Sequence, residues 1–103
     1  MKLMTDEIRN KLPALYTHEH SQPPDVPVVV KYFNPYGAGT WYITEFDGED
    51  MMFGLCCIQE PELRYVSLKE LQTLRVFGRF TLERDLHWHG SLADAMKREG
   101  YLH

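Results

Sequence analysis

The sequence contains no Lys or Arg between Lys31 and Arg64, and other features are scarce as well. It has two cysteines, Cys56 and Cys57, and we expect no disulfide between them because neighbouring side chains on a strand point to opposite faces. No apolar run approaches the length of a membrane span, and the N-terminus turns acidic where a signal peptide needs an apolar stretch. These absences predict a cytoplasmic protein with reduced thiols and no membrane contact.

The chain is short and acidic. Its 103 residues, of which 44% are hydrophobic, suffice for one domain with a core, so we expect a single domain over residues 1–103. The 11 basic and 15 acidic residues give a net charge of −4. Domains that hold nucleic acid mainly by neutralising phosphates are usually basic. The composition therefore disfavours that class but leaves a local basic patch open.

Periodicity and turn signals predict an α+β domain with the element order α-β-β-β-β-α-β-α. The three expected helices begin after residues that can cap a helix N-terminus, namely Thr5, Ser67 and Ser91. The five expected strands occupy residues 26–33, 40–46, 51–58, 63–66 and 82–88. Residues 17–27 have no period and include two adjacent prolines, which predicts a loop. Hairpin connections dominate, so we expect a mostly antiparallel sheet, with strand 51–58 in its centre and helices on one side.

An acidic turn, residues 47–50, joins two apolar strands within the stretch that has no base. Its Asp-Gly pair is a strong hairpin signal. Three interpretations are open: a solvated structural turn, a site for a divalent cation and a surface for a partner. A partner surface would combine the acids with the aromatic pair on the preceding strand, which are Trp41, Tyr42, Glu45, Asp47, Glu49 and Asp50.

Charge is segregated along the chain. From Glu45 to Glu62 there are six acids and no base, whereas from Arg64 to Arg84 there are five bases and two acids. With several aromatic residues close by in the sequence, this pattern is compatible with a surface for a protein or for a single nucleic-acid strand. The alternative is that charges on neighbouring strands, such as those of Arg64 and Glu60, pair and cancel.

Two His-x-His units have the spacing of metal ligands on a strand, His18 with His20 and His87 with His89. The first unit falls in the predicted loop, so surface or packing roles are the simpler interpretation, and we predict neither a metal nor a cofactor. Burial of Cys56 and Cys57 in an apolar strand would raise their pKa and disfavour a nucleophilic role.

Glu83 and Asp85 lie two residues apart and would share one face of the last strand. Paired carboxylates can act in acid–base chemistry. Alternation with Leu82, Arg84 and Leu86 explains the same residues as a half-exposed edge strand.

Several segments resemble a family of small bacterial proteins of unknown function found on plasmids, conjugative elements and phages. The resemblance is carried by residues 3–16, 41–42, 45–50, 53–55, 67–71 and 83–86. It implies a bacterial cytoplasmic protein with an accessory role for mobile DNA. It supplies no activity and no catalytic residue.

The sequence therefore favours a non-enzymatic binding or adaptor protein that meets a protein partner through an acidic and aromatic surface. Host-defence evasion and plasmid or phage maintenance are the roles that the resemblance suggests, and nucleic acid is a second kind of partner. The alternative hypothesis is a metal-dependent hydrolase or nuclease that uses the acidic turn or the Glu83 and Asp85 carboxylates.

Overall fold

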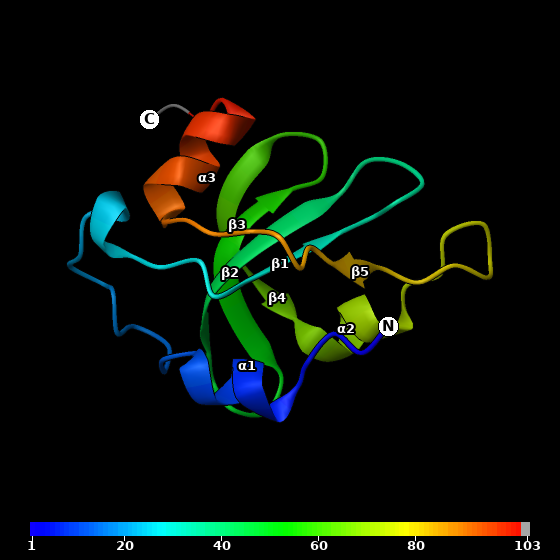
Figure 1. Cartoon of the computed structure of the whole chain (residues 1–103), viewed down its shortest axis with the longest axis horizontal. Helices are drawn as coiled ribbons and strands as arrows, with labels where there is room; N and C mark the ends of the chain where they lie inside the picture. The colour runs from blue at the N-terminus through cyan, green and yellow to red at the C-terminus, as the bar shows by residue number, and fades with distance from the viewer. Residues whose placement is uncertain (102–103) are drawn as a thin grey trace.

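A computed structural model describes residues 1–101, which form a five-stranded antiparallel sheet with three α-helices (Figure 1). The strands are β1 (Val30–Phe33), β2 (Thr40–Phe46), β3 (Met51–Cys57), β4 (Pro61–Ser67) and β5 (Glu83–Arg84). The helices are α1 (Asp6–Lys11), α2 (Leu68–Thr73) and α3 (Leu92–Glu99). The predicted fold class and order of elements are confirmed.

The central strand of the sheet is β2. The strand order is β4-β3-β2-β1-β5, and every residue of β2 after Thr40 is buried. The prediction that the strand at 51–58 is central was wrong, because β1 carries β5 on its other edge and so moves the middle of the sheet to β2.

Helices pack on both faces of the sheet. Leu68 and Leu71 of α2 belong to one core cluster with Trp41, whereas α3 packs in a second cluster with Tyr42. Trp41 and Tyr42 are neighbours on β2 and point to opposite faces. The expectation of helices on one side was therefore wrong, and the reason is that β2 and β3 are apolar on both faces.

The predicted caps are present at all three helices. The Thr5 hydroxyl accepts a hydrogen bond from the Ile8 N–H at 3.1 Å, and the Ser67 hydroxyl accepts one from the Glu70 N–H at 3.1 Å. At α3, Ser91 and Asp94 form a reciprocal capping box. These short-range hydrogen bonds explain where each helix begins.

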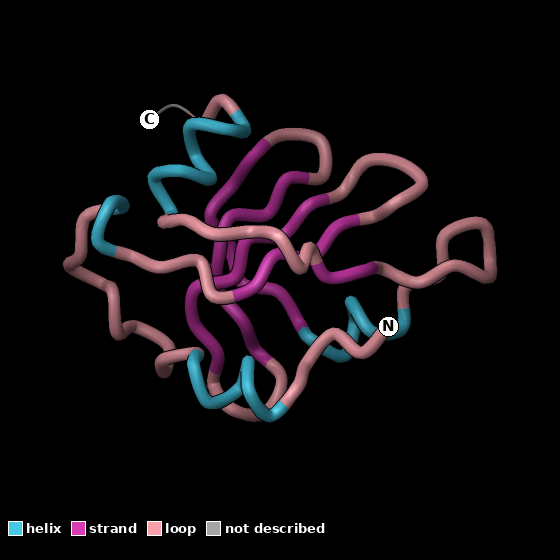
Figure 2. The backbone as a smooth tube through the Cα atoms, viewed as in Figure 1, coloured by secondary structure: helices cyan, strands magenta, loops and turns pink. Residues whose placement is uncertain are grey.

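Three predicted elements are shorter or more irregular than expected. The strand expected at 26–33 is confined to Val30–Phe33, because residues 26–28 pair instead with residues 90–92. The expected strand 82–88 is reduced to Glu83–Arg84, and residues 85–90 continue as a loop (Figure 2). The predicted loop 17–27 contains one 3-10 turn, Pro23–Asp25, where both prolines sit in the first turn and need no amide proton. None of the helices within residues 1–101 is long and apolar enough to cross a membrane.

Candidate functional site

The acidic turn is closed by its own first residue. One carboxylate oxygen of Asp47, Oδ1, accepts hydrogen bonds from the backbone N–H groups of Glu49, Asp50 and Met51 at 2.8, 2.8 and 3.1 Å. These bonds favour the ionised form and hold the pKa of Asp47 below its usual value. The charge of Asp47 therefore has a structural use within the turn.

Asp50 ties the turn to the start of α2. Its Oδ2 accepts the Ser67 hydroxyl at 2.6 Å, and its Oδ1 accepts the Lys69 N–H at 2.7 Å. The Ser67 bond, followed by that from Lys69, lowers the pKa of Asp50. The middle acid, Glu49, is exposed at the tip.

The aromatic pair that the sequence places beside the acids is buried. Trp41 is 5% exposed and Tyr42 is 0% exposed, because both faces of the central strand are covered. The Tyr42 hydroxyl donates a hydrogen bond to Glu99 Oε2 at 2.6 Å, inside the α3 contact. The expectation of exposed aromatics at these two positions was wrong, and both residues belong to the core.

A β-bulge on β2 redirects Glu45. Ile43 pairs with Gly54 and Glu45 pairs with Phe53, so Thr44 is the extra residue between them. A bulge shifts the alternation of side chains by one position. Neighbouring residues on a regular strand point to opposite faces. Because of the bulge, Thr44 and Glu45 instead both line one cavity on the α3 side of the sheet.

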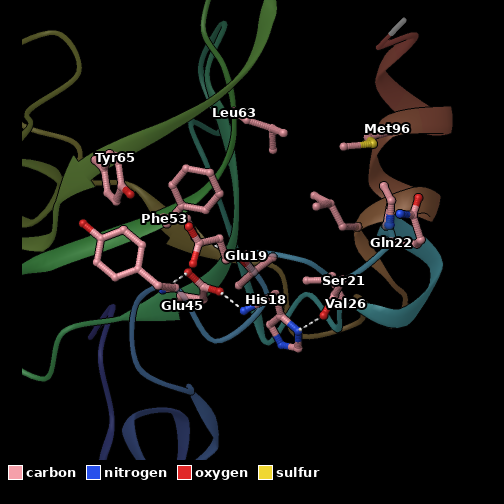
Figure 3. A pocket seen from close by; sticks show the side chains of 14 residues that line it. His18, Glu19, Ser21, Gln22, Val26, Glu45, Phe53, Leu63, Tyr65 and Met96 are labelled. Atoms are coloured by element: carbon pink, nitrogen blue, oxygen red, sulfur yellow. Dashed lines mark hydrogen bonds between the residues drawn. The ribbon is translucent and has the colours of Figure 1, made fainter. Parts of the chain in front are cut away.

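The Glu45 carboxylate holds the loop before the 3-10 turn at Pro23–Asp25 against the sheet. Glu45 is 4% exposed, and its two oxygens accept hydrogen bonds from the backbone N–H groups of Tyr16 at 3.0 Å and His18 at 2.8 Å (Figure 3). Buried carboxylates are stable only with such partners. Each oxygen has a further lone pair for another donor.

The cavity has a volume of about 510 Å³ and lies between the sheet, α3 and the loop at 16–26. Figure 3 shows Phe53 and Tyr65 on one side of it and Gln22 and Met96 on the other. We call it the acidic–aromatic pocket, and its lining residues are Tyr16, His18, Glu19, Ser21, Gln22, Pro23, Val26, Thr44, Glu45, Phe53, Leu63, Tyr65, Leu92 and Met96.

Three aromatic rings meet at this pocket. Phe53 and Tyr65 have ring centroids 4.9 Å apart, and Tyr16 meets Tyr65 edge-on at 6.4 Å. A hydrogen bond with the Tyr16 hydroxyl raises the pKa of Tyr65 above its usual value. Tyr16 and Tyr65 are partly exposed, at 63% and 46%, and form the open side of the site.

The lining is negatively charged. It contains Glu19 and Glu45, and none of its described members is Lys or Arg. The His18 ring is bound through Nδ1 to the Ser21 hydroxyl at 3.2 Å. Carboxylates and aromatic faces both attract cations, and the apolar walls suit a hydrocarbon stem. The pocket is therefore chemically suited to bind a cationic group carried on a hydrocarbon chain.

The other sequence candidates do not come together. Across residues 1–101, no group of three or more His, Cys, Asp or Glu side chains could hold a metal ion. His87 and His89 follow β5 in a loop, and His20 is exposed.

The Asp85 carboxylate is engaged in contacts within the fold. It accepts the His87 N–H at 2.9 Å and lies 3.2 Å from the ammonium of the buried Lys31. The hydrogen bond from His87, followed by the Lys31 contact, lowers the pKa of Asp85. No observation on the described chain favours the hydrolase hypothesis, so we do not propose it.

The sequence pointed to Glu45 and, as part of a His-x-His unit, to His18, but not to the aromatic residues of the pocket. Tyr16, Phe53 and Tyr65 come from a loop and two strands that only the folded chain brings together. The one usable signal was the absence of bases between Lys31 and Arg64, because that stretch supplies four of the lining residues on β2, β3 and β4.

Fold and site together define a small α+β domain with one bulged central strand and an acidic–aromatic pocket beside its edge strand. The chain belongs to the family of proteins of unknown function DUF2958, whose model matches residues 3–95. All of the lining residues except Met96 fall within that match. No curated protein and no solved structure matches the chain.

Proposed function

We propose that this chain is a non-enzymatic binding or adaptor protein that takes up a basic side chain of a protein partner in the acidic–aromatic pocket. The observation that carries the proposal is a pocket lined by two glutamates and three aromatic rings, with neither Lys nor Arg among its described lining residues. Its volume of about 510 Å³ is in the range of ordinary ligand sites.

A bound Arg or Lys side chain would use each part of the lining. The Glu45 carboxylate is inside and Glu19 is at the exposed rim, so a cation would meet both. The faces of Phe53 and Tyr65 add cation–π attraction. The aliphatic stem would pack on Leu63 and the α3 side chains.

The position of the pocket favours a polypeptide over a free amine. Its wall includes Leu63 and Tyr65 of β4, and β4 is the outer strand of the sheet with β3 as its single neighbour in the strand order. An extended segment can add to such an edge and place alternate side chains in an adjoining pocket. A partner strand beside β4 would thus deliver its basic side chain to Glu45.

We further propose that this binding of a protein partner takes place in the bacterial cytoplasm and supports a mobile genetic element. Host-defence evasion and plasmid or phage maintenance are the roles we propose. The support is the resemblance of six segments of the chain to small proteins of plasmids, conjugative elements and phages.

The proposal is tested with short peptides that differ at one position. Acetylated Thr-Val-Arg-Val-Thr amide, and the same peptide with Lys, citrulline or Glu in the middle, are titrated into ¹⁵N-labelled protein. We expect the Arg and Lys peptides to shift the amide signals of Tyr16, Phe53 and Tyr65 in a saturable way. The citrulline and Glu peptides should bind more weakly, because they lack the cation.

Matched variants locate the site. Glu19→Gln should weaken binding of the Arg peptide about two- to fivefold, the size of a partly exposed ion pair. Glu49→Gln makes the same change outside the pocket and should leave the affinity unchanged. Equal binding of the Arg and Glu peptides, or equal effects of the two variants, would contradict the proposal.

A further inference from the structure

A second exposed cluster lies away from the pocket, on two loops at the far end of the molecule (Figure 1). One loop joins β1 to β2, and the other joins α2 to β5. We call this cluster the basic–aromatic patch, and its members are Tyr36, Arg75, Phe77, Arg79 and Phe80. The acidic–aromatic pocket uses none of them.

The rings of the patch form one continuous aromatic surface. Tyr36 lies 4.4 Å from Phe80, with their planes tilted by 33°, and meets Phe77 edge-on at 6.4 Å. Phe77 is 75% exposed and Tyr36 is 51% exposed. Large apolar side chains at this exposure leave much of their surface in water, and their grouping is typical of an interaction site.

The backbone presents Phe77 at the tip of a tight turn. Val76 and Phe80 exchange backbone hydrogen bonds at 2.6 and 3.0 Å, so Phe77, Gly78 and Arg79 form the connection. Phe77 has φ 55°, the left-handed region that a bulky side chain rarely adopts. A strained backbone that holds an exposed ring outward is expected where the ring has a ligand.

The patch is positively charged although the whole chain is acidic. Residues 71–82 contain Arg75 and Arg79 and no Asp or Glu, against a net charge of −4 for the chain. The Arg79 guanidinium lies 5.4 Å from the centroid of the Phe80 ring. Arg79 therefore flanks the aromatic surface directly, whereas the Arg75 guanidinium, on the same loop, donates hydrogen bonds to the Gln72 and Leu74 carbonyls.

We infer that the basic–aromatic patch binds single-stranded nucleic acid. Unpaired bases stack on aromatic side chains whatever their sequence, and nearby cations attract the phosphates. A duplex keeps its bases inside and would meet only two arginines, too few for tight binding by charge alone. An acidic peptide would satisfy the arginines but would leave three rings without a stacking partner.

The test is fluorescence anisotropy with a labelled oligothymidylate of fifteen nucleotides and a duplex of the same length, at 50 mM and 200 mM salt. We expect the single strand to bind the full chain more tightly than the duplex and to weaken as salt rises. Phe77→Ala should weaken binding about fivefold or more, the loss of one base stack. Arg79→Gln should also weaken it and reduce the salt dependence by about one ion.

Control variants change similar groups elsewhere. Arg64→Gln removes an exposed arginine on β4, and Leu86→Ala removes an exposed apolar side chain outside the patch. Both should bind as wild type. Tyr36→Ala provides a second ring variant in case Phe77→Ala alters the turn, and amide spectra check the fold of each protein.

Four results would overturn the inference. They are no binding of the single strand at 50 mM salt, equal binding of the duplex, full affinity in both ring variants, and binding of polyglutamate or phosphatidylglycerol vesicles in place of the oligonucleotide.

Discussion

At the scale of single residues, neighbouring acids in one turn have different roles. Asp47 and Asp50 accept hydrogen bonds that build the turn and anchor α2, whereas Glu49 between them is exposed. The surplus negative charge that the sequence shows at this turn is therefore mostly structural.

The first prediction concerns Asp50. Asp50→Ala removes the acceptor of the Ser67 hydroxyl and of the Lys69 N–H at the start of α2. Loss of such a capping interaction should lower the melting temperature by about 5 °C. Glu49→Ala, one residue away, should shift it by about 1 °C or less. Thermal unfolding followed by circular dichroism measures both, and equal shifts would show that Asp50 has no special role.

The second prediction concerns acid stability. Hydrogen bonds lower the folded pKa of Asp47 below its unfolded value of about 3.9. Its contribution to stability is therefore present above about pH 4 and is lost as pH falls through the lower folded pKa. Asp47→Asn keeps the Oδ1 acceptor and cannot titrate.

Urea unfolding at several pH values between about 5 and 2 tests this. Wild type should lose more stability over that range than Asp47→Asn, with the two proteins closer together at the acid end. Parallel curves would mean that the carboxylate of Asp47 does not titrate differently on folding.

Some residue roles could be predicted because they depend on local sequence. Thr5, Ser67 and Ser91 cap helices through bonds to an amide three residues later, which the sequence alone displays. Glu45 is different. The face to which its side chain points depends on a bulge in the pairing of β2 with β3, and no local sequence pattern predicts that bulge.

At the scale of elements, the bulge has a partner in Gly54. A Cβ atom at Gly54 would lie 1.8 Å from the Tyr42 carbonyl oxygen and 2.9 Å from the Ile43 Cα. These are backbone atoms of the central strand and cannot move without breaking the sheet. Gly54 therefore permits the close approach of β3 to the bulged part of β2.

The third prediction follows from this contact. Gly54→Ala should reduce the free energy of unfolding by about 3 kcal/mol, the upper end of overpacking costs. Gly37→Ala is the matched control, because the nearest atom to its new Cβ would be Asn34 Nδ2 at 3.5 Å. It should change stability by less than about 0.5 kcal/mol. Urea unfolding compares the two, and a stable Gly54→Ala protein would contradict this strand spacing.

Elements with strong internal signals were predicted well, and those that depend on tertiary pairing were not. β2 was predicted with its bounds, because its β-branched and aromatic residues lie between clear turns. The strand expected at 82–88 is reduced to Glu83–Arg84, because the chain turns at Asp85, whose carboxylate accepts the His87 N–H and whose carbonyl accepts the Trp88 N–H.

At the scale of the whole molecule, the order of elements could be predicted but their layers could not. Hairpin turns predict antiparallel neighbours, whereas the choice of face for each helix depends on packing. The covering of both faces by α2 and α3 also buries Cys56 and partly covers Cys57. Cys56 is 2% exposed beneath α2, and Cys57 is half-buried on the other face, near Glu99.

The last prediction concerns these thiols. Burial raises the pKa of Cys56 to about 12, and burial together with the nearby Glu99 carboxylate raises that of Cys57 to about 12. An unfolded cysteine titrates near 8.5, so the fold favours the neutral thiols. Their contribution to stability is full below about pH 8.5 and is lost as pH rises toward the folded values.

Two measurements follow from the same shift. At pH 7 the folded chain should react with Ellman's reagent roughly a hundredfold more slowly than free cysteine, because the attacking thiolate is scarce. In guanidinium chloride both cysteines should react at the rate of free cysteine. The free energy of unfolding should also fall between about pH 8.5 and pH 11. A thiol that reacts rapidly in the folded protein would show that one face of the sheet is less well covered than α2 and α3 make it.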